Sequence, residues 1–91
     1  MSEHLVRRGP FWHFQRWTPE QFRAVEPRKM IFQSTKVRVA DDPDKRRARR
    51  IADRINDALE AYWRDLAAGK ARGATHRYRE TVQRAQRLGF E

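Results

Sequence analysis

Residues 42–66, DPDKRRARRIADRINDALEAYWRDL, have the pattern of one long amphipathic helix. Asp42 is a favourable capping residue, and Pro43 suits the first helical position because its φ is fixed and it has no N–H to leave unpaired. Asp44 adds a negative charge near the positive end of the helix dipole. Gly69 supplies a left-handed stop after the other end. We therefore expect a single helix that begins at residues 42–43 and runs to residue 66.

Apolar side chains recur along this stretch at spacings of three and four residues and form one continuous stripe. They are Ala48, Ile51, Ala52, Ile55, Ala58, Leu59, Tyr62, Trp63 and Leu66. At about 1.5 Å per residue the helix is roughly 40 Å long. Another element must therefore cover the stripe.

The composition limits the kinds of protein that the chain can be. With 91 residues, 38% of them hydrophobic, it is one small domain or a domain plus a fragment of the next, with a modest core. The absence of cysteine excludes disulfides and cysteine-based zinc or redox sites. There is no apolar run of ~18 residues and no signal-peptide pattern, so we expect a soluble cytoplasmic protein with no membrane partner.

The excess of positive charge lies at the two ends of the sequence rather than in the long helix. The chain carries 21 Lys and Arg against 12 Asp and Glu, a net charge of +9. Residues 1–40 have eight basic and three acidic side chains, residues 41–68 seven and seven, and residues 69–91 six and two. This distribution favours a polyanionic partner, most commonly nucleic acid. A surplus that only keeps a small protein in solution is the alternative.

Residues 4–17 have the pattern of a β-hairpin closed by Gly9-Pro10, in which Gly takes the positive φ of a type II′ turn. The register then pairs Arg7 with Trp12, Val6 with His13 and Leu5 with Phe14. We expect the face that carries Leu5, Trp12 and Phe14 to be the core face.

A third strand is predicted over residues 28–39, which are rich in β-branched and aromatic side chains. We expect Ile31, Thr35 and Val37 to face inward. The Thr18-Pro19-Glu20-Gln21 sequence fits a capping box, so a short helical turn is expected to run to Val25 with Phe22 facing inward.

These elements predict an α+β fold, in which a three-stranded antiparallel β-sheet packs on one long α-helix and a second C-terminal helix follows. Residues 69–74 have the composition of a linker. Residues 75–91 predict the second helix, with a narrow stripe of Tyr78, Val82, Ala85 and Leu88 that ends at Gly89 and Phe90. We expect residues 1–68 to be one domain and residues 75–91 to begin another.

The sheet face that the long helix does not cover is the functional candidate.

The motifs that carry a family resemblance are Leu5-Val6-Arg7-Arg8-Gly9, Phe11-Trp12-His13-Phe14-Gln15-Arg16 with Thr18-Pro19, Phe32-Gln33-Ser34-Thr35, and Asp42-Pro43-Asp44-Lys45-Arg46-Arg47-Ala48. In this order they resemble the N-terminal arm-type DNA-binding domain of phage-type tyrosine recombinases (integrases). The resemblance implies a DNA-binding domain of a bacterial, nucleoid-associated recombinase that acts in DNA integration and recombination. It implies that residues 75–91 open a core-binding domain, and that the catalytic residues belong to a later domain of the parent chain.

Double-stranded DNA is the expected partner, because a β-sheet can place alternate side chains in the major groove while flanking cations contact phosphates. The candidates for base contact are Arg8, His13 and Gln15. The candidates for phosphate contact are Arg7, Arg16, Arg28, Lys29, Lys36 and Arg38.

Other interpretations remain open at the level of sequence. Phe11, Trp17 and Phe32 could form an aromatic patch that docks a protein, or a platform on which single-stranded bases stack. The basic run of residues 45–50 with Arg54 could contact phosphate, but its members surround the helix axis and could instead pair with Asp53 and Asp57.

No catalytic function, cofactor, metal ion or small-molecule substrate is expected for these residues. His4, His13 and His76 lack the spacing of metal ligands, and Ser2 and Ser34 have no evident base nearby in the sequence.

Overall fold

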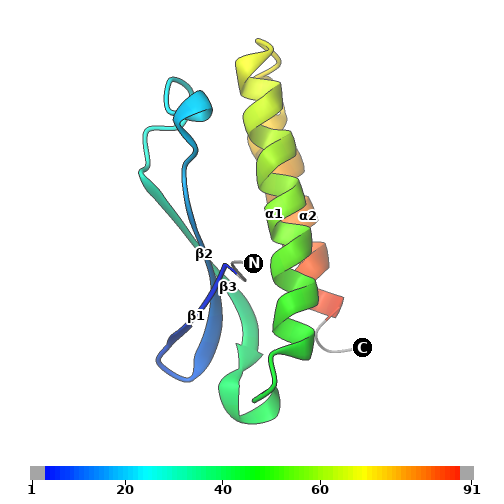
Figure 1. Ribbon diagram of the computed structural model, residues 1–91. Coiled ribbons are helices and arrows are strands. Elements are labelled where there is room, and N and C mark those ends of the chain that lie inside the picture. Colours follow the sequence, from blue (N-terminus) through cyan, green and yellow to red (C-terminus); the bar gives the residue numbers. More distant parts are fainter. Residues whose placement is uncertain (1–3, 89–91) are drawn as a thin grey trace.

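The computed structural model describes residues 4–88 and has two layers, a β-sheet and a pair of helices (Figure 1). The strands are β1 (Leu5–Arg8), β2 (Phe11–Trp17) and β3 (Met30–Arg38), and the helices are α1 (Arg46–Ala67) and α2 (Ala74–Leu88). Two short 3-10 helices, η1 (Glu20–Phe22) and η2 (Val39–Asp41), lie on either side of β3 in the sequence. The sheet is antiparallel in the order β1-β2-β3. The predicted α+β fold is confirmed.

The hairpin has the predicted register, with Leu5 opposite Phe14, Val6 opposite His13 and Arg7 opposite Trp12. Gly9 has a φ of 60°, which glycine adopts without the steric penalty of a Cβ. Phe14 and Trp12 are buried, and Leu5 packs against the same core. The core face of the hairpin is therefore as predicted.

Strand β3 also has the predicted phase, since Ile31, Thr35 and Val37 are all buried. It contains a bulge that the sequence did not indicate. Phe11 pairs with Arg38 and His13 pairs with Ser34, so four steps along β3 oppose two steps along β2. Within the bulge Lys36 has a φ of 59°.

The buried hydroxyl of Thr35 stabilises this bulge. It donates to the Trp12 carbonyl at 2.7 Å and accepts the Val37 N–H at 3.2 Å. The side chain thus replaces ladder hydrogen bonds that the bulge disrupts, and a polar residue can be fully buried.

The predicted start of the long helix at residues 42–43 is wrong, because α1 begins at Arg46. The Asp42 carbonyl accepts Trp12 Nε1–H at 2.9 Å and the Lys45 N–H at 3.0 Å, in a tight turn rather than a helical turn. The Asp42 carboxylate still caps the helix, since Oδ2 accepts the Ala48 N–H at 2.8 Å. Because the hydrogen bond from Trp12 of β2 holds Asp42 in a turn, α1 begins only at Arg46. The Asp42 carboxylate therefore caps the helix from outside its first turn.

The predicted capping box at Thr18 is also wrong. The Thr18 hydroxyl donates to the Arg28 carbonyl at 2.6 Å and so closes the loop between β2 and β3. Only the 3-10 helix η1 forms, and its first turn has no side-chain cap. Phe22 nevertheless packs inward as predicted, with its ring stacked on Trp63 at a centroid distance of 5.3 Å.

Gly69 ends α1 as predicted, with a φ of 79°. The Lys70 N–H donates to the Asp65 carbonyl and the Gly69 N–H to the Leu66 carbonyl, which is the Schellman pattern.

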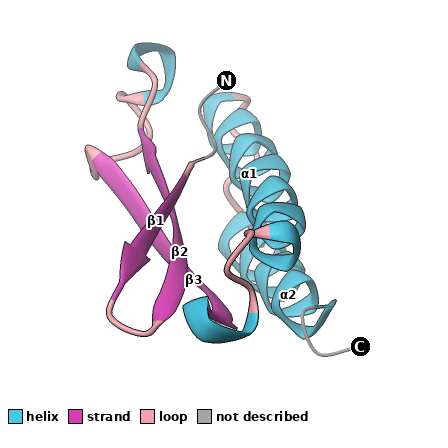
Figure 2. Cartoon of the chain, turned by 60° about the horizontal axis from the view of Figure 1, so that its bottom comes forward, coloured by secondary structure: helices cyan, strands magenta, loops and turns pink. Residues whose placement is uncertain are grey.

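Helix α2 folds back along α1, and both helices lie on the same side of the sheet (Figure 2). Val82 and Ala85 of α2 belong to the core that α1 shares with Phe14 and Ile31 of the sheet. The Gln86 amide donates to the Ser34 carbonyl of β3 at 2.8 Å.

The helix stop predicted at Gly89 and Phe90 lies outside the described residues, as does the side chain of Leu88. Over residues 4–88 no helix has the length and apolarity that crossing a membrane requires.

Candidate nucleic-acid interface

One side of the sheet is not covered by either helix, and we call it the free face. Its side chains alternate with the buried ones along each strand and line up across the three strands. They are Val6 and Arg8 from β1, Phe11, His13, Gln15 and Trp17 from β2, and Met30, Phe32, Ser34 and Arg38 from β3. The free face therefore combines aromatic rings with cationic and hydrogen-bonding groups.

Two arginines of the free face lie over aromatic rings. The Arg8 guanidinium carbon is 4.6 Å from the Phe32 ring centroid, and that of Arg38 is 5.9 Å from the Phe11 ring centroid. Such contacts are attractive because the π face of the ring is electronegative. Neither arginine has a carboxylate partner among its described contacts. The two guanidinium groups are thus held on the sheet with their hydrogen-bond donors still available.

His13 occupies the centre of the free face, between Val6 and Ser34 on the neighbouring strands. Its Nδ1 atom is buried and has no hydrogen-bond partner among the described protein atoms. Buried polar atoms normally have a partner, so an unpaired one needs an explanation. Gln15 lies on the same strand, opposite Phe32, and is partly buried.

The structure brings Arg8, His13, Gln15 and Arg38 of the predicted site together on the free face. Arg7 is exposed near the hairpin turn and, by alternation, belongs to the opposite side of β1. Lys29 is exposed just before β3. Three predicted contacts do not lie on the free face, namely Arg16, Arg28 and Lys36.

Arg16 points toward α1 rather than away from the sheet. Its Nη1 donates to Asn56 Oδ1 at 2.6 Å and to Glu60 Oε1 at 2.7 Å, and its guanidinium carbon is 5.2 Å from the Trp63 ring centroid. The side chain is only 17% exposed. Arg16 therefore joins the two layers, and we do not include it in the candidate interface.

The Arg28 side chain is bound to Glu26 through two hydrogen bonds, of 3.0 Å from Nε and 2.9 Å from Nη2, and the Arg28 backbone N–H donates to the same carboxylate at 3.3 Å. Glu26 is buried and also accepts Trp63 Nε1–H at 3.2 Å. Burial raises the pKa of this carboxyl, but the hydrogen bonds from Arg28 and Trp63 outweigh burial and leave the pKa below its ordinary value. Glu26 in turn raises the pKa of Arg28. The pair links the β2–β3 loop to α1, and so it has a structural role.

The aromatic partners of Arg8 and Arg38 were not predicted as members of the DNA site. Phe11 and Phe32 were recognised only as members of a possible aromatic patch. In sequence, Arg8 and Phe32 are 24 positions apart and on strands that are not neighbours, so only the twisted sheet brings them together. No local pattern could have revealed this pair.

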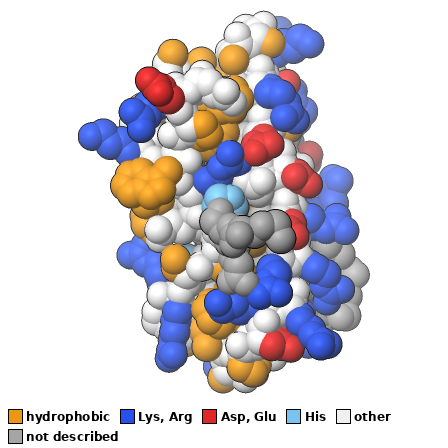
Figure 3. Space-filling view, viewed as in Figure 1, with side chains coloured by type: hydrophobic (Ala, Val, Ile, Leu, Met, Phe, Trp, Pro, Cys, Tyr) orange, Lys and Arg blue, Asp and Glu red, His pale blue; other side chains and the backbone are white. Residues whose placement is uncertain are grey.

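On the side of the molecule shown in Figure 3, basic side chains lie over both layers, and most of the visible Asp and Glu side chains lie over α1. Several of these carboxylates already have basic partners, as in the Arg16–Glu60 and Arg77–Asp65 pairs. The free face has no acidic member. Its potential is therefore favourable for an anion.

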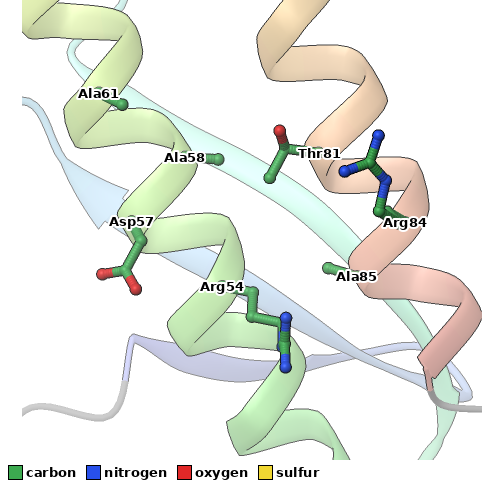
Figure 4. Close-up of a pocket in the computed structure, with 7 residues that line it drawn as sticks. All are labelled: Arg54, Asp57, Ala58, Ala61, Thr81, Arg84 and Ala85. Atoms are coloured by element: carbon green, nitrogen blue, oxygen red, sulfur yellow. The ribbon is translucent and has the colours of Figure 1, made fainter.

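A groove of about 450 Å³ separates α1 and α2 (Figure 4). Ala58 of α1 and Thr81 of α2 point toward each other across it, and Arg54, Asp57 and Arg84 lie at its sides. It holds a single carboxylate and no histidine, and no cluster of three potential metal-ligating side chains occurs within residues 4–88.

Searches against protein-family models, curated proteins and solved structures find no match for this chain.

Proposed function

We propose that the free face binds double-stranded DNA, with Arg8 and Arg38 as its principal cationic contacts. The observation that carries the proposal is the pair of guanidinium groups held over Phe32 and Phe11 on a sheet face without carboxylates. Arginine binds phosphate and guanine through paired N–H donors, and a sheet can enter the major groove. His13 and Gln15, at the centre of the same face, are the base-contact candidates.

The wider context of this proposal is the N-terminal arm-type domain of a phage-type tyrosine recombinase. It is supported by the order of the sequence motifs, which lie on β1, β2, β3 and at the start of α1. In that context the domain contacts DNA during integration and recombination, and the parent chain supplies the catalytic domain.

Duplex DNA is favoured over single strands because the rings that would stack on bases already have cationic partners. The Arg8 guanidinium lies over Phe32, and the Arg38 guanidinium lies over Phe11. Trp17 has no cationic partner among its described contacts, and 64% of its surface is exposed, against 44% for Phe32. An exposed aromatic of this size is the one observation that favours the second candidate, a protein-docking surface.

The experiment measures the affinity for a duplex oligonucleotide and for each of its single strands at two salt concentrations. We expect preferential duplex binding that weakens steeply with salt, because bound cations displace counterions. Arg8→Ala is expected to weaken duplex binding about tenfold, which is within the range for loss of one specific arginine contact. Arg50→Ala is the matched control, since it removes the same charge from the exposed side of α1.

Two aromatic variants separate the candidate functions. Phe32→Leu is expected to weaken duplex binding because Arg8 loses its ring partner, whereas Trp17→Leu is expected to leave it unchanged. A larger effect of Trp17→Leu together with a preference for single strands would support stacking. Indifference to DNA at both salt concentrations would instead support docking, and a larger effect of Arg50→Ala would move the site to α1.

A further inference from the structure

A notch of about 390 Å³ lies between β3 and α2, lined by Lys36, Gln83, Gln86 and Arg87. None of these four lining residues is acidic. Two are cations and two carry amide groups, a combination suited to a phosphate group. The basic residue from the strand and the one from the helix are 51 positions apart in sequence, so the notch exists only in the folded chain.

The bulge in β3 positions the strand side of the notch. Lys36 has a left-handed φ of 59°, and its N–H donates to the Ser34 hydroxyl at 2.9 Å. This conformation takes Lys36 out of the regular alternation of the strand. Its side chain is exposed at the edge of the sheet beside α2.

The helix side of the notch is held by Gln86. This side chain is 6% exposed, and its Nε2 donates to the Ser34 carbonyl at 2.8 Å. Ser34 therefore fixes both walls, through its hydroxyl to Lys36 and through its carbonyl to Gln86. Arg87, the next residue of α2, is exposed beside them.

Electrostatics require both cations for an anion to bind here. The notch lies at the C-terminal end of α2, where the helix dipole is negative and opposes an anion. Lys36 and Arg87 together must offset this effect. Removing one of them therefore weakens the site, and removing both eliminates it.

The notch lies at the β3 edge of the sheet, and β3 also carries residues of the free face. Arg38, which lies over Phe11 on that face, is two residues beyond Lys36 on the same strand. At about 3.4 Å per residue this separation is about 7 Å or less, which corresponds to about two phosphates of one DNA strand at ~3.4 Å of helix axis each. A DNA backbone that crosses the free face at Arg38 reaches the notch with its next phosphates.

We infer that the notch binds a backbone phosphate of the same duplex that occupies the free face, so that the DNA bridges β3 and α2. This inference rests on the proposed function and adds α2 to the DNA-binding surface. Its consequence is that DNA holds the last turns of α2 against the sheet.

The test compares two double variants with equal loss of charge. Lys36→Gln/Arg87→Gln removes the two cations of the notch. Arg72→Gln/Arg79→Gln removes two exposed cations before and near the start of α2, away from the notch. We expect the notch variant to bind duplex about tenfold more weakly and to reduce the slope of log K against log salt by about one. The control variant is expected to lose no more than about twofold.

A second measurement separates a bound phosphate from a general effect of charge. In the unmodified chain, duplex is expected to slow hydrogen exchange of the backbone amides of residues 83–87, and in the notch variant it is not. Equal affinity losses in the two double variants, or no added protection of residues 83–87, would overturn the inference. Thermal unfolding midpoints equal to that of the unmodified chain establish that both variants fold.

The two proposals fail in different ways. If Arg8→Ala weakens duplex binding while the notch variant matches its control, the notch inference is wrong and the free-face proposal stands. If the unmodified chain does not bind duplex, the free-face proposal fails and the notch inference fails with it.

Discussion

Individual polar side chains, rather than apolar contact alone, join the sheet to the helices. Arg16 reaches from β2 to Asn56 and Glu60 of α1, and Glu26 accepts a hydrogen bond from Trp63. These groups are buried or partly buried, so each needs its partner. From sequence, Arg16 is predicted to contact DNA phosphate as one of the cations that flank the sheet. Its position under α1 depends on side chains 40 and 44 residues away.

The Glu26 carboxylate provides a test at this level. Glu26→Gln is expected to lower the free energy of unfolding at neutral pH by about 1–2 kcal/mol. The reason is that the buried Trp63 N–H and the half-exposed Arg28 guanidinium lose their charged acceptor. Glu20→Gln, which changes an exposed carboxylate, is the control and is expected to have little effect.

The effect of pH on Glu26 has a definite sign. The pKa of Glu26 in the folded chain is below its ordinary value of 4.5, so the folded state binds the proton more weakly than the unfolded state. Its stabilising contribution is therefore present above that value and is lost as the pH falls through the lower folded pKa. We expect the difference in unfolding midpoint between the unmodified chain and Glu26→Gln to shrink as the pH falls from neutral through 4.5 and below. A difference that is the same throughout this range would contradict the role of the ionised carboxylate.

A tertiary hydrogen bond decides where α1 begins, whereas the local sequence decides its interior and its end. The interior of α1 follows its apolar stripe, with Ile51, Ile55, Leu59 and Trp63 almost fully buried. Its C-terminus follows the local signal of Gly69. Its N-terminus does not follow the signal of Pro43, because Trp12 holds the Asp42 carbonyl in a turn. Asp42 is thereby both a link to β2 and the cap of α1.

Because Asp42 has both roles, its replacement is expected to destabilise the chain more than replacement of the nearby Asp44. Asp42→Ala is expected to destabilise the chain by about 1–2 kcal/mol, since the Ala48 N–H loses its acceptor. Asp44→Ala is the matched control and is expected to be nearly neutral, because its contact with the Arg46 N–H is 3.5 Å long and its ion pair with the Arg46 side chain joins two exposed groups. Urea unfolding of the two variants measures both values. Equal losses would show that α1 is capped by the local sequence after all.

At the scale of the molecule, both helices and the sheet share one hydrophobic core. Tyr78 packs on Tyr62 at a centroid distance of 5.4 Å, and burial raises the pKa of the Tyr78 hydroxyl. Val82 and Ala85 are buried within the same core. The sequence interpretation placed residues 75–91 at the start of a following domain, and that assignment stays a prediction. In the structure α2 is packed as part of this core.

Removal of α2 tests how far the core depends on it. A chain that ends at residue 72 loses the burial of Val82, which by itself stabilises by at least about 1.5 kcal/mol. For a domain of this size that corresponds to an unfolding midpoint lower by at least about 6 °C. Differential scanning calorimetry of the two chains measures the change. An unchanged midpoint would mean that residues 1–68 form an independent domain, as the sequence interpretation proposed.

The sequence by itself determined the elements, the hairpin register and the faces that are buried. The reason is that periodicity and turn chemistry are local: Gly9 permits its turn, and the alternation of Trp12 and Phe14 selects the core face. The tertiary structure alone decided where α1 begins, which arginines remain available and which do not. These depend on partners distant in sequence: Trp12 for Asp42, Glu60 for Arg16 and Phe32 for Arg8. The notch between Lys36 and Arg87 likewise exists only because α2 folds back onto β3, which no local pattern encodes.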